Sequence, residues 1–392
     1  MRILHICAYT WSIGGPARMI YDHTQIAVAA GHQVDILSPM SPNDQLYPAP
    51  EGSRVIPCLR TPVISRFFRE VSLDLYRYLK AHSSDYDIIH CHGLWHFGSI
   101  APFLVNKTVP KVITVHGVLD AWALRQSRWK KQLMDFLVQK KFMAQADLIH
   151  ILNEDERQDV ERYLGYQHPR IVLIPNGIRV SDFSNLPPRG QFRNEFNLDA
   201  GQRMVLFMSR LNIKKGLDLL LPAFRDYCRR HSDAVLVLAG SDDGYQQEAQ
   251  QFISRNGLEK QIRLVGMLTG ETKLAALADA DVFVLPSYSE GLSMAVLEAM
   301  AAGVPALISD RVGLGRRVGQ IQAACLTDLN PESIAQNLDT VLHNATLAET
   351  LKNNARQLVQ NQYDINVVGS QLLQEYKNLV FSSHQRSESH PA

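Results

Sequence analysis

A regular alternation of short apolar runs with longer amphipathic segments limits this 392-residue chain to few folds. In the first half the short runs read "RILHICAY", "HQVDILSP", "YDIIHCH", "KVITVHG", "DLIHILN" and "RIVLIPNG". Amphipathic segments such as "PARMIYDHTQIAVAAG" and "DLYRYLKAH" lie between them. Strands that alternate with helices predict a parallel sheet covered by helices on both faces. We expect this sheet to be complete by Gly177.

The pattern stops and then begins again. Residues 184–200, "SNLPPRGQFRNEFNLDA", contain adjacent prolines and no hydrophobic period, which is typical of a linker. Strands are then predicted at "MVLFMSR", "AVLVLAG", "IRLVG", "DVFVLPS" and "PALISD", with helices between them. The sequence therefore predicts an α/β protein of two doubly wound domains that face each other across a cleft. Their expected ranges are 1–185 and 197–365, with a helix at 366–380 completing the first domain and a disordered tail at 383–392.

Composition excludes several classes of function. The formal charge is +1, from 40 basic and 39 acidic residues, so no global positive field indicates a nucleic-acid partner. The 5 cysteines are scattered and show no C-x-x-C spacing, so neither a disulfide framework nor a zinc site is indicated. A reducing cytoplasm is the simplest compartment.

No apolar run approaches the roughly 20 residues that a membrane-spanning helix needs, and the N-terminus reads as a first strand rather than a signal peptide. Residues 122–142, "WALRQSRWKKQLMDFLVQKKF", form a basic and aromatic amphipathic segment. Such a helix can pack its apolar stripe inward, or it can rest on anionic lipid. Both readings stay open, the second as peripheral contact with the inner face of a membrane.

Ligands of open parallel sheets bind at the carboxyl ends of strands, so the residues that follow each strand deserve inspection. After the first strand, Gly14 and Gly15 precede Pro16, a favoured residue in the first turn of a helix. The free amides of a helix N-terminus accept anions. A plain turn is the alternative. The G-x-G-x-x-G fingerprint is absent, so no nicotinamide cofactor is indicated.

Basic residues follow the first strand of the second domain, in "MSRLNIKKGLDLL". Arg210 comes directly after the strand, and Lys215 stands beside Gly216, which opens a helix. A guanidinium and an ammonium group this close together suit a phosphate ligand. A solvated basic turn is the alternative.

Carboxylates occur in "PSYSEGLSMAVLEAM", where a strand gives way to a helix. Glu290 and Gly291 lie in the predicted turn, and Glu298 lies about two helical turns further on, or ~10 Å along the axis. One carboxylate at the mouth of the site and one deeper suit a ligand with hydroxyl groups at both ends and an anion between them. This is the outline of a nucleotide sugar.

Together with "SRLNIKKG", "IGGP", "TVHG" and "IPNG", the E-x7-E motif at Glu290 to Glu298 resembles the retaining GT-B glycosyltransferases of glycosyltransferase family 4. The resemblance covers nearly the whole chain, to about Leu379. It implies that the first domain binds the acceptor and the second binds the nucleotide sugar.

The resemblance also implies roles for individual residues. Arg210 and Lys215 would neutralise the diphosphate, Glu290 would bind the transferred sugar and Glu298 the ribose. His116 of "TVHG" would contact the sugar near the reacting carbon. The catalytic candidates are therefore His116, Glu290, Arg210 and Lys215. The other candidate binding residues are Gly15, Gly291, Leu292, Ser293, Met267 and Leu268, the last two beside the base.

The implied function is transfer of a hexose, with retention and without a metal or other cofactor, from a UDP- or GDP-linked sugar. The acceptor would be a hydroxyl group of a lipid-linked, polysaccharide or glycolipid precursor. A nucleotide-sugar 2-epimerase and a non-enzymatic nucleotide-sugar sensor are the alternatives. The sequence does not name the sugar, the base, the acceptor or the oligomeric state.

Some other patterns are weaker. Asp279 with Asp281, and Asp85 with Asp87, form D-x-D pairs, but both pairs precede strands and should lie away from the site. "VGMLTGETK" lacks the G-K-[ST] of a P-loop. His90, His92 and His96 are read as hydrogen-bonded polar groups on the acceptor side rather than metal ligands. Trp95 and His96 are weak candidates for acceptor contact.

Overall fold

A computed structural model describes residues 1–12, 15–62, 70–119 and 138–389. The chain divides into two units, Met1–Gly177 with Ile365–Ala392, and Ile178–Asp364. The boundary thus falls earlier than residue 185, and the segment predicted as a linker belongs to the second unit. The tail differs from the prediction too, because the last helix continues to Ser389. The segment 120–137, which holds most of the amphipathic stretch, lies outside the described residues.

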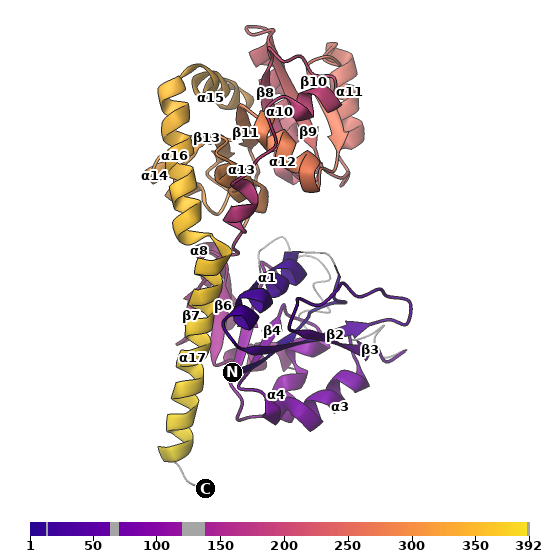
Figure 1. The fold of residues 1–392 in the computed structure, drawn as a ribbon, viewed down its shortest axis with the longest axis vertical. Coiled ribbons are helices and arrows are strands. Elements are labelled where there is room, and N and C mark those ends of the chain that lie inside the picture. Colours follow the sequence, from indigo (N-terminus) through magenta and orange to yellow (C-terminus); the bar gives the residue numbers. More distant parts are fainter. Residues whose placement is uncertain (13–14, 63–69, 120–137, 390–392) are drawn as a thin grey trace. The chain divides into compact units, whose positions relative to one another are not determined.

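The first unit contains a 7-stranded sheet in the order β3-β2-β1-β4-β5-β6-β7, in which every pair is parallel (Figure 1). Its strands are β1 (Arg2–Ile6), β2 (Gln33–Met40), β3 (Arg54–Leu59), β4 (Ile88–His92), β5 (Lys111–Thr114), β6 (Leu148–Ile151) and β7 (Ile171–Leu173). The described helices are α1 (Gly15–Ala29), α3 (Leu73–His82), α4 (Ala101–Val105), α7 (Lys140–Ala144), α8 (Glu154–Leu164) and α17 (Ile365–Ser389).

The two faces of this sheet bury different sets of side chains, as a period of two residues along each strand requires. Leu4, Ile89 and Ile113 pack on the face that includes residues of α3 and α8. Ile3 and Ile88 pack on the opposite face, with residues of α1 and α17. Helix α17, the long yellow helix of Figure 1, therefore completes the core of the first unit although it is the last helix of the chain.

The second unit contains a 6-stranded sheet in the order β10-β9-β8-β11-β12-β13, again with every pair parallel. Its strands are β8 (Arg203–Met208), β9 (Ala234–Ala239), β10 (Ile262–Gly266), β11 (Val282–Leu285), β12 (Ala306–Ser309) and β13 (Cys325–Thr327). Its described helices are α9 (Gln191–Glu195), α10 (Leu217–Cys228), α11 (Gln246–Asn256), α12 (Gly270–Asp279), α13 (Met294–Ala302), α14 (Gly315–Gln320), α15 (Pro331–His343) and α16 (Ala345–Gln362).

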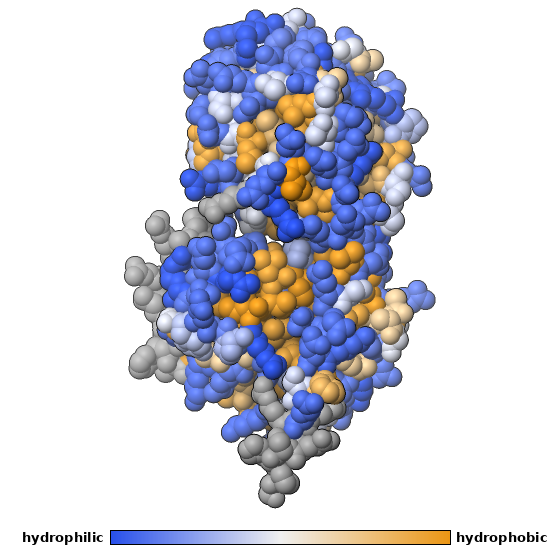
Figure 2. Space-filling view, turned by 90° about the vertical axis from the view of Figure 1, so that its left-hand side faces the viewer, coloured by the Kyte–Doolittle hydropathy of each residue, from blue (hydrophilic) through white to orange (hydrophobic). Residues whose placement is uncertain are grey.

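Both sheets reverse their strand order at one point, between β1 and β4 in the first unit and between β8 and β11 in the second. Ligands of open parallel sheets bind at the carboxyl ends of the strands at such a point, because the helices that follow the two neighbouring strands leave in opposite directions. The surface in the view of Figure 2 is mostly hydrophilic, with patches of apolar side chains. No helix in the described part of the chain combines the length and the hydrophobicity that crossing a bilayer requires.

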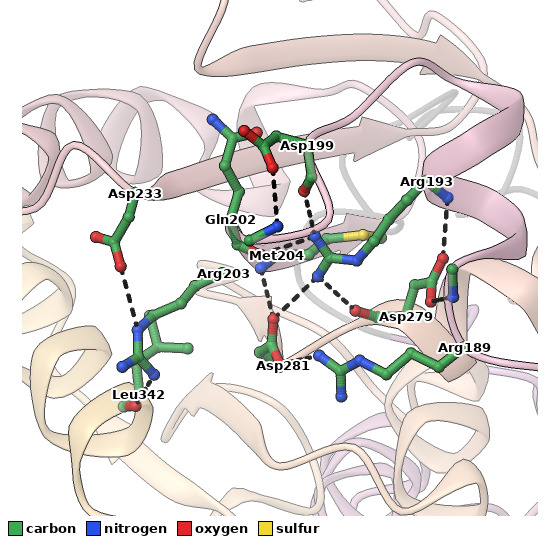
Figure 3. A network of polar contacts seen from close by, with 12 residues as sticks. Arg189, Arg193, Asp199, Gln202, Arg203, Met204, Asp233, Asp279, Asp281 and Leu342 are labelled. Carbon is green, nitrogen blue, oxygen red and sulfur yellow. Dashed lines mark hydrogen bonds and ion pairs between the residues drawn. The ribbon is translucent and has the colours of Figure 1, made fainter.

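An arginine–aspartate network binds the start of the second unit to the amino edge of its sheet (Figure 3). Arg193 is 3% exposed and donates to the backbone carbonyl of Asp279 at 3.1 Å and to the carboxylate of Asp281 at 3.2 Å. Asp279 also accepts from the amides of Gly190 and Arg193, and Asp281 from that of Met204. This D-x-D pair is thus engaged by an arginine and by backbone amides, at the edge opposite the strand ends that were predicted to bind a ligand.

Close backbone packing joins the ends of β8 and β11. Gly216, directly before α10, has φ +73°, and a Cβ atom there would overlap the carbonyl group of Pro286. Only glycine satisfies both the left-handed conformation and this approach. The contact holds the loop of Lys215 against the segment that leads to Glu290.

Replacing Gly216 by alanine should therefore destabilise the second unit more than a change of conformation alone would. We expect Gly216→Ala to lower the free energy of unfolding by about 3 kcal/mol, from backbone strain plus overlap. Gly257→Ala is the control, because Gly257 has φ +64° and open space around it, and it should cost about 1 kcal/mol. Urea unfolding followed by circular dichroism measures both; equal losses would show that the contact with Pro286 contributes nothing.

Candidate functional site

The predicted phosphate-binding cations lie at the carboxyl end of β8, where the strand order of the second sheet reverses. The chain leaves β8 through Arg210, turns at Asn212, and forms a short 3-10 helix, η5 (Ile213–Lys215). Asn212 caps η5 by accepting from the amide of Lys214 at 2.8 Å, and its side-chain amide donates to the carbonyl of Asp243 at 2.8 Å. The loop is therefore held by one hydrogen bond within it and by another to the loop that follows β9.

Lys215 and Glu290 form an ion pair at this strand end. Lys215 comes after β8 and Glu290 after β11, so the pair joins the two strands that flank the reversal point. The side chains are 10% and 18% exposed. A charge this far removed from water is stable only with an opposite charge beside it. The structure thus brings together two residues that the sequence had singled out separately.

Arg210 is bound differently. Its guanidinium donates to the carboxylate of Asp243 at 2.7 Å, and its side chain is 66% exposed. An exposed pair of this kind adds about 0–1 kcal/mol to stability. Another anion can therefore replace Asp243 at little cost in free energy. Asp243 had no signal in the sequence analysis, because nothing in its local pattern distinguishes it from other loop acids.

The segment between β11 and α13 is fixed by its backbone. The amide of Glu290 donates to the carbonyl of Arg311 at 3.1 Å, and the amide of Gly313 donates to the carbonyl of Glu290 at 2.8 Å. Ser293 caps α13 and accepts from the amide of Val296 at 3.4 Å. Gly291 and Leu292 therefore lead into the N-terminus of a helix, whose positive dipole end favours an anion.

Glu298 lies in α13 and pairs with Lys273 of α12 at 2.7 Å. The carboxylate is 20% exposed, so it is reachable from solvent. Lys273 was not predicted, since its partner lies on another helix. Beside α12, at the end of β10, Met267 is 69% exposed, whereas Leu268 is buried.

Polar side chains also occupy the carboxyl half of one face in the first sheet. Along β1, β4 and β6, an apolar residue near the start of the strand (Ile3, Ile88, Leu148) is followed two positions later by a buried histidine (His5, His90, His150). His92 and Thr114 continue this polar row and are also buried. Because the period is two, all of these residues lie on the same face of the sheet.

These side chains are hydrogen-bonded to one another. His5 Nδ1 lies 2.9 Å from His92 Nε2, and His92 Nδ1 lies 3.1 Å from Nε2 of His116. His90 Nε2 lies 2.6 Å from Thr114 Oγ1, which lies 2.8 Å from Nδ1 of His150. The prediction that His90 and His92 are hydrogen-bonded polar groups therefore agrees with these contacts, and the network extends further than the sequence indicated.

The loop of His116 is held by a buried carboxyl group. His116 has φ +56°, an uncommon conformation for a residue with a side chain. Glu156 of α8 accepts from the amide of Leu152 at 2.7 Å and also from that of Gly117. Burial raises the pKa of Glu156 to about 7, and these backbone hydrogen bonds oppose the shift. The sequence analysis did not predict this role of Glu156, because acidic residues in the first turn of a helix are common and are explained by their interaction with the helix dipole.

Comparison with known proteins adds to this geometry. Residues 188–358 match the family model described as "Glycosyl transferases group 1", and residues 13–182 match "Glycosyltransferase Family 4". A phosphatidyl-myo-inositol mannosyltransferase of Mycobacterium leprae is 27% identical, over 97% of this chain and 98% of the relative. The second unit therefore matches the group 1 glycosyltransferases, and the chain is a glycosyltransferase with the GT-B fold. Its first unit is of the family 4 type.

Solved structures show the same fold for the glycosyltransferase. Sucrose-phosphate synthase from Thermosynechococcus elongatus superposes with a TM-score of 0.76 and 22% identity, over 97% of this chain and 99% of that one. Anabaena HepE in complex with UDP and glucose gives a TM-score of 0.76 at 17% identity, over 96% and 100% of the chains. These similarities establish two Rossmann-like domains of the GT-B type.

The structure also shows where Gly15, Trp95 and His96 of the first unit lie. Gly15 opens α1, as expected of a helix N-terminus, whereas residues 13 and 14 lie outside the described part. Trp95 and His96 were predicted to contact an acceptor. Both are buried: Trp95 packs at right angles to Tyr163, and Nε2 of His96 lies 2.8 Å from the carbonyl of His92. Their described contacts hold the loop after β4.

Elsewhere, the second D-x-D pair is engaged at the amino edge of the first sheet. Asp87 accepts from the amide of Arg2 at 2.7 Å, and Asp85 lies 3.1 Å from His82.

A hollow of about 670 Å³ lies at the amino edge of the second sheet, lined in part by Arg189, Arg203 and Asp281. None of the predicted site residues lines it.

The buried histidines make the stability of the first unit depend on pH. Burial lowers the pKa of His23 to about 3, and neither ring nitrogen has a hydrogen-bond partner among the described residues. An unfolded histidine takes up a proton near pH 6.5. The native protein excludes that proton, so His23 opposes folding progressively as the pH falls below 6.5.

His23→Leu should remove the contribution of His23 to this pH dependence. When the pH falls from 7.5 to 5.0, we expect the unfolding free energy of the wild type to fall by about 2 kcal/mol more than that of the variant. Urea unfolding followed by tryptophan fluorescence measures it, since all 4 tryptophans precede residue 178. His168→Leu serves as a control outside the histidine network. Parallel pH curves for wild type and His23→Leu would contradict the prediction.

Proposed function

We propose that the protein is a retaining, metal-independent hexosyltransferase that uses a nucleoside diphosphate sugar as donor. The observation that carries the proposal is the partly buried Lys215–Glu290 ion pair, at the reversal point of the second sheet and in the segment that leads to the N-terminus of α13. In this proposal Lys215 would bind a phosphate, and the neighbouring carboxylate of Glu290 would bind sugar hydroxyl groups. Lys215, Arg210 and the amides of Gly291 to Ser293 would then bind the diphosphate and the adjoining sugar oxygens.

Each of the two cations of this site has an acidic partner, because Arg210 pairs with Asp243 and Lys215 pairs with Glu290. When a diphosphate binds, it would take the place of Asp243 beside Arg210, since that pair is exposed and weak. Lys215 would bind a phosphate oxygen while staying beside Glu290, whose carboxylate would accept from hydroxyl groups of the transferred sugar.

Other residues would bind the ribose, the base and the transferred sugar. Glu298 would bind the ribose hydroxyl groups, in competition with Lys273. The base would lie against the exposed side chain of Met267 and the backbone near Leu268, which explains why the base is weakly encoded in the sequence. Gly15, at the start of α1, would approach the phosphates, and His116 would contact the transferred sugar near its anomeric carbon.

In the proposed reaction the bond between the anomeric carbon and the diphosphate oxygen breaks, and its electron pair stays on the diphosphate. An acceptor hydroxyl oxygen forms the new bond on the same face of the sugar. Its proton passes to a donor phosphate oxygen. Well-placed donors such as Lys215 would stabilise the leaving charge by about 3 kcal/mol each.

The donor is proposed to be a UDP- or GDP-linked hexose, and the acceptor a hydroxyl group of a lipid-linked, polysaccharide or glycolipid precursor. Two similarities support this choice. The mycobacterial relative is named as a mannosyltransferase of phosphatidyl-myo-inositol, and HepE was solved with UDP and glucose. Action at the cytoplasmic face of a membrane, by peripheral contact, is part of the proposal.

Screening nucleotides by thermal shift tests the donor site. A ligand that binds the folded protein raises its melting temperature according to its affinity. UDP, GDP, ADP and their sugars are compared with and without EDTA. One nucleotide series should raise the melting temperature, and EDTA should leave the shift unchanged. No shift with any nucleotide, or transferase activity that EDTA abolishes, would overturn the proposal.

Lys215→Ala tests the leaving-group role. We expect turnover to fall by about 100-fold or more, because one charged donor to the departing diphosphate is lost. The control is Arg229→Ala, which removes an exposed arginine near the end of α10. A melting-temperature comparison excludes unfolding, and Lys215→Arg should recover part of the rate. Turnover equal to that of Arg229→Ala would remove Lys215 from this role.

Products formed without an acceptor separate the transferase from its alternative. A nucleotide-sugar 2-epimerase would convert the donor into an isomer, which ion-exchange chromatography resolves. The transferase would give only slow hydrolysis under these conditions. The anomeric configuration of the transferred sugar, read by NMR, decides between retention and inversion.

A further inference from the structure

Two hydrogen-bonded chains of buried side chains cross the face of the first sheet that α1 and α17 cover. The first chain runs from His5 through His92 to His116. The second chain runs from the hydroxyl group of Tyr376 in α17, through His90, Thr114 and His150, to the carbonyl of Ile174. The proposed function uses only the outer end of the first chain, at His116.

The imidazoles in these chains are neutral at physiological pH. Burial lowers the pKa of His5 and His116 to about 3 and that of His150 to about 4. It also lowers the pKa values of His90 and His92 well below the usual 6.5. A neutral imidazole has one N–H donor and one acceptor nitrogen. Each hydrogen bond in a chain therefore fixes the direction of the next.

The direction of the second chain follows from its last member. The carbonyl of Ile174 can only accept, so His150 Nε2, 2.7 Å away, carries the proton. His150 Nδ1 must then accept from the hydroxyl group of Thr114, which in turn accepts from Nε2 of His90. Nδ1 of His90 accepts from Tyr376, at 2.5 Å. The carbonyl of Ile174 thus determines which atom carries the proton in every hydrogen bond of the second chain.

The first chain permits two directions. In one, His116 donates to His92 and His92 donates to His5, which places the proton of His5 on Nε2. No acceptor for that N–H lies among the described residues. In the other direction, His5 donates to His92, His92 donates to His116, and the proton of His116 lies on Nδ1. The second direction is favoured, because His5 is only 1% exposed, and in such a position an N–H group without an acceptor is rarer than an acceptor without a donor.

We propose that His5 and His92 are positioning residues, which hold His116 in the tautomer that is protonated on Nδ1. His116 Nε2 is directed to His92, so Nδ1 is the nitrogen left to face a ligand, and it presents an N–H donor to a sugar oxygen. His5 and His92 are buried and act only through His116. The kinetic consequence rests on the proposed transferase function, whereas the tautomer itself does not.

A metal ion is the competing explanation for this cluster. One ring nitrogen from each of His5, His90 and His92 lies within 4.8 Å of the others. However, both nitrogens of His90 and both of His92 already take part in hydrogen bonds. A bound ion would have to break several of these bonds, whereas the chains account for the same short distances without one.

NMR of the full-length protein, labelled with ¹⁵N in its histidine rings, tests the proposal directly. Long-range correlations distinguish a protonated from an unprotonated ring nitrogen, and His116→Gln assigns the signal. We expect the wild type to show His116 protonated on Nδ1 alone. His5→Leu should give a mixture of tautomers at His116, although His5 does not touch it. His5→Asn should restore the single tautomer, because its side-chain amide can donate to His92.

Thr114→Val is the matched control. It interrupts the second chain at an equally buried position and should leave the His116 signal unchanged. A wild-type His116 protonated on Nε2, or a change in Thr114→Val equal to that in His5→Leu, would overturn the proposal. So would stoichiometric Zn²⁺ in the purified protein, if its removal by a chelator altered the signals of His5, His90 and His92.

Kinetics then link the tautomer to the reaction. His5→Leu should lower kcat about 10- to 100-fold through loss of orientation, with the KM for the donor changed less than about twofold. His5→Asn should recover most of the loss. If the wild type transfers no sugar from any donor, the proposed function fails, and the NMR result still decides whether the chain fixes His116.

Discussion

Parallel strands end at a common edge of their sheet, and the chemistry of this protein depends on that constraint. At the reversal points, β1 lies beside β4 and β8 lies beside β11. The loops that leave such neighbouring strands diverge, so backbone amides and side chains meet there without being covered by a helix. The Lys215–Glu290 pair joins residues that follow β8 and β11, and the His5–His92 hydrogen bond joins β1 to β4. Both link strands that are adjacent in space and distant in sequence.

Much of this arrangement could be predicted from the sequence. The alternation of apolar runs with amphipathic segments located most strands of both sheets, because buried parallel strands require such runs. The edge strands β3 and β13 were not predicted. The positions of Arg210, Lys215, Glu290 and Glu298 followed from their place after strands. Their partners could not be predicted in the same way. Asp243 and Lys273 reach the site from other loops and helices, and only the three-dimensional structure reveals such pairs.

Two predictions of the sequence analysis differ from the structure, and the reasons can be identified. Prolines and polar residues at 184–200 were read as a linker, although Arg193 and its aspartate partners bind this segment to the second sheet. Hydrogen bonds to distant acids leave no local pattern. The polar tail was read as disordered, whereas α17 continues through it to Ser389. Burial of Leu372 and Tyr376 anchors the helix, and its polar end then extends by propagation.

The connectivity of α17 has a consequence for how this architecture can be divided. The first unit is discontinuous, because its chain leaves at Gly177 and returns at Ile365. The first and last residues of the second unit lie close together, and the amide of Ile178 donates to the carbonyl of Tyr363 at 2.8 Å. The second unit is in effect an insertion with adjacent ends. We therefore expect that it can be excised or exchanged as one contiguous segment, whereas a fragment that stops at Gly177 lacks the helix that completes its core.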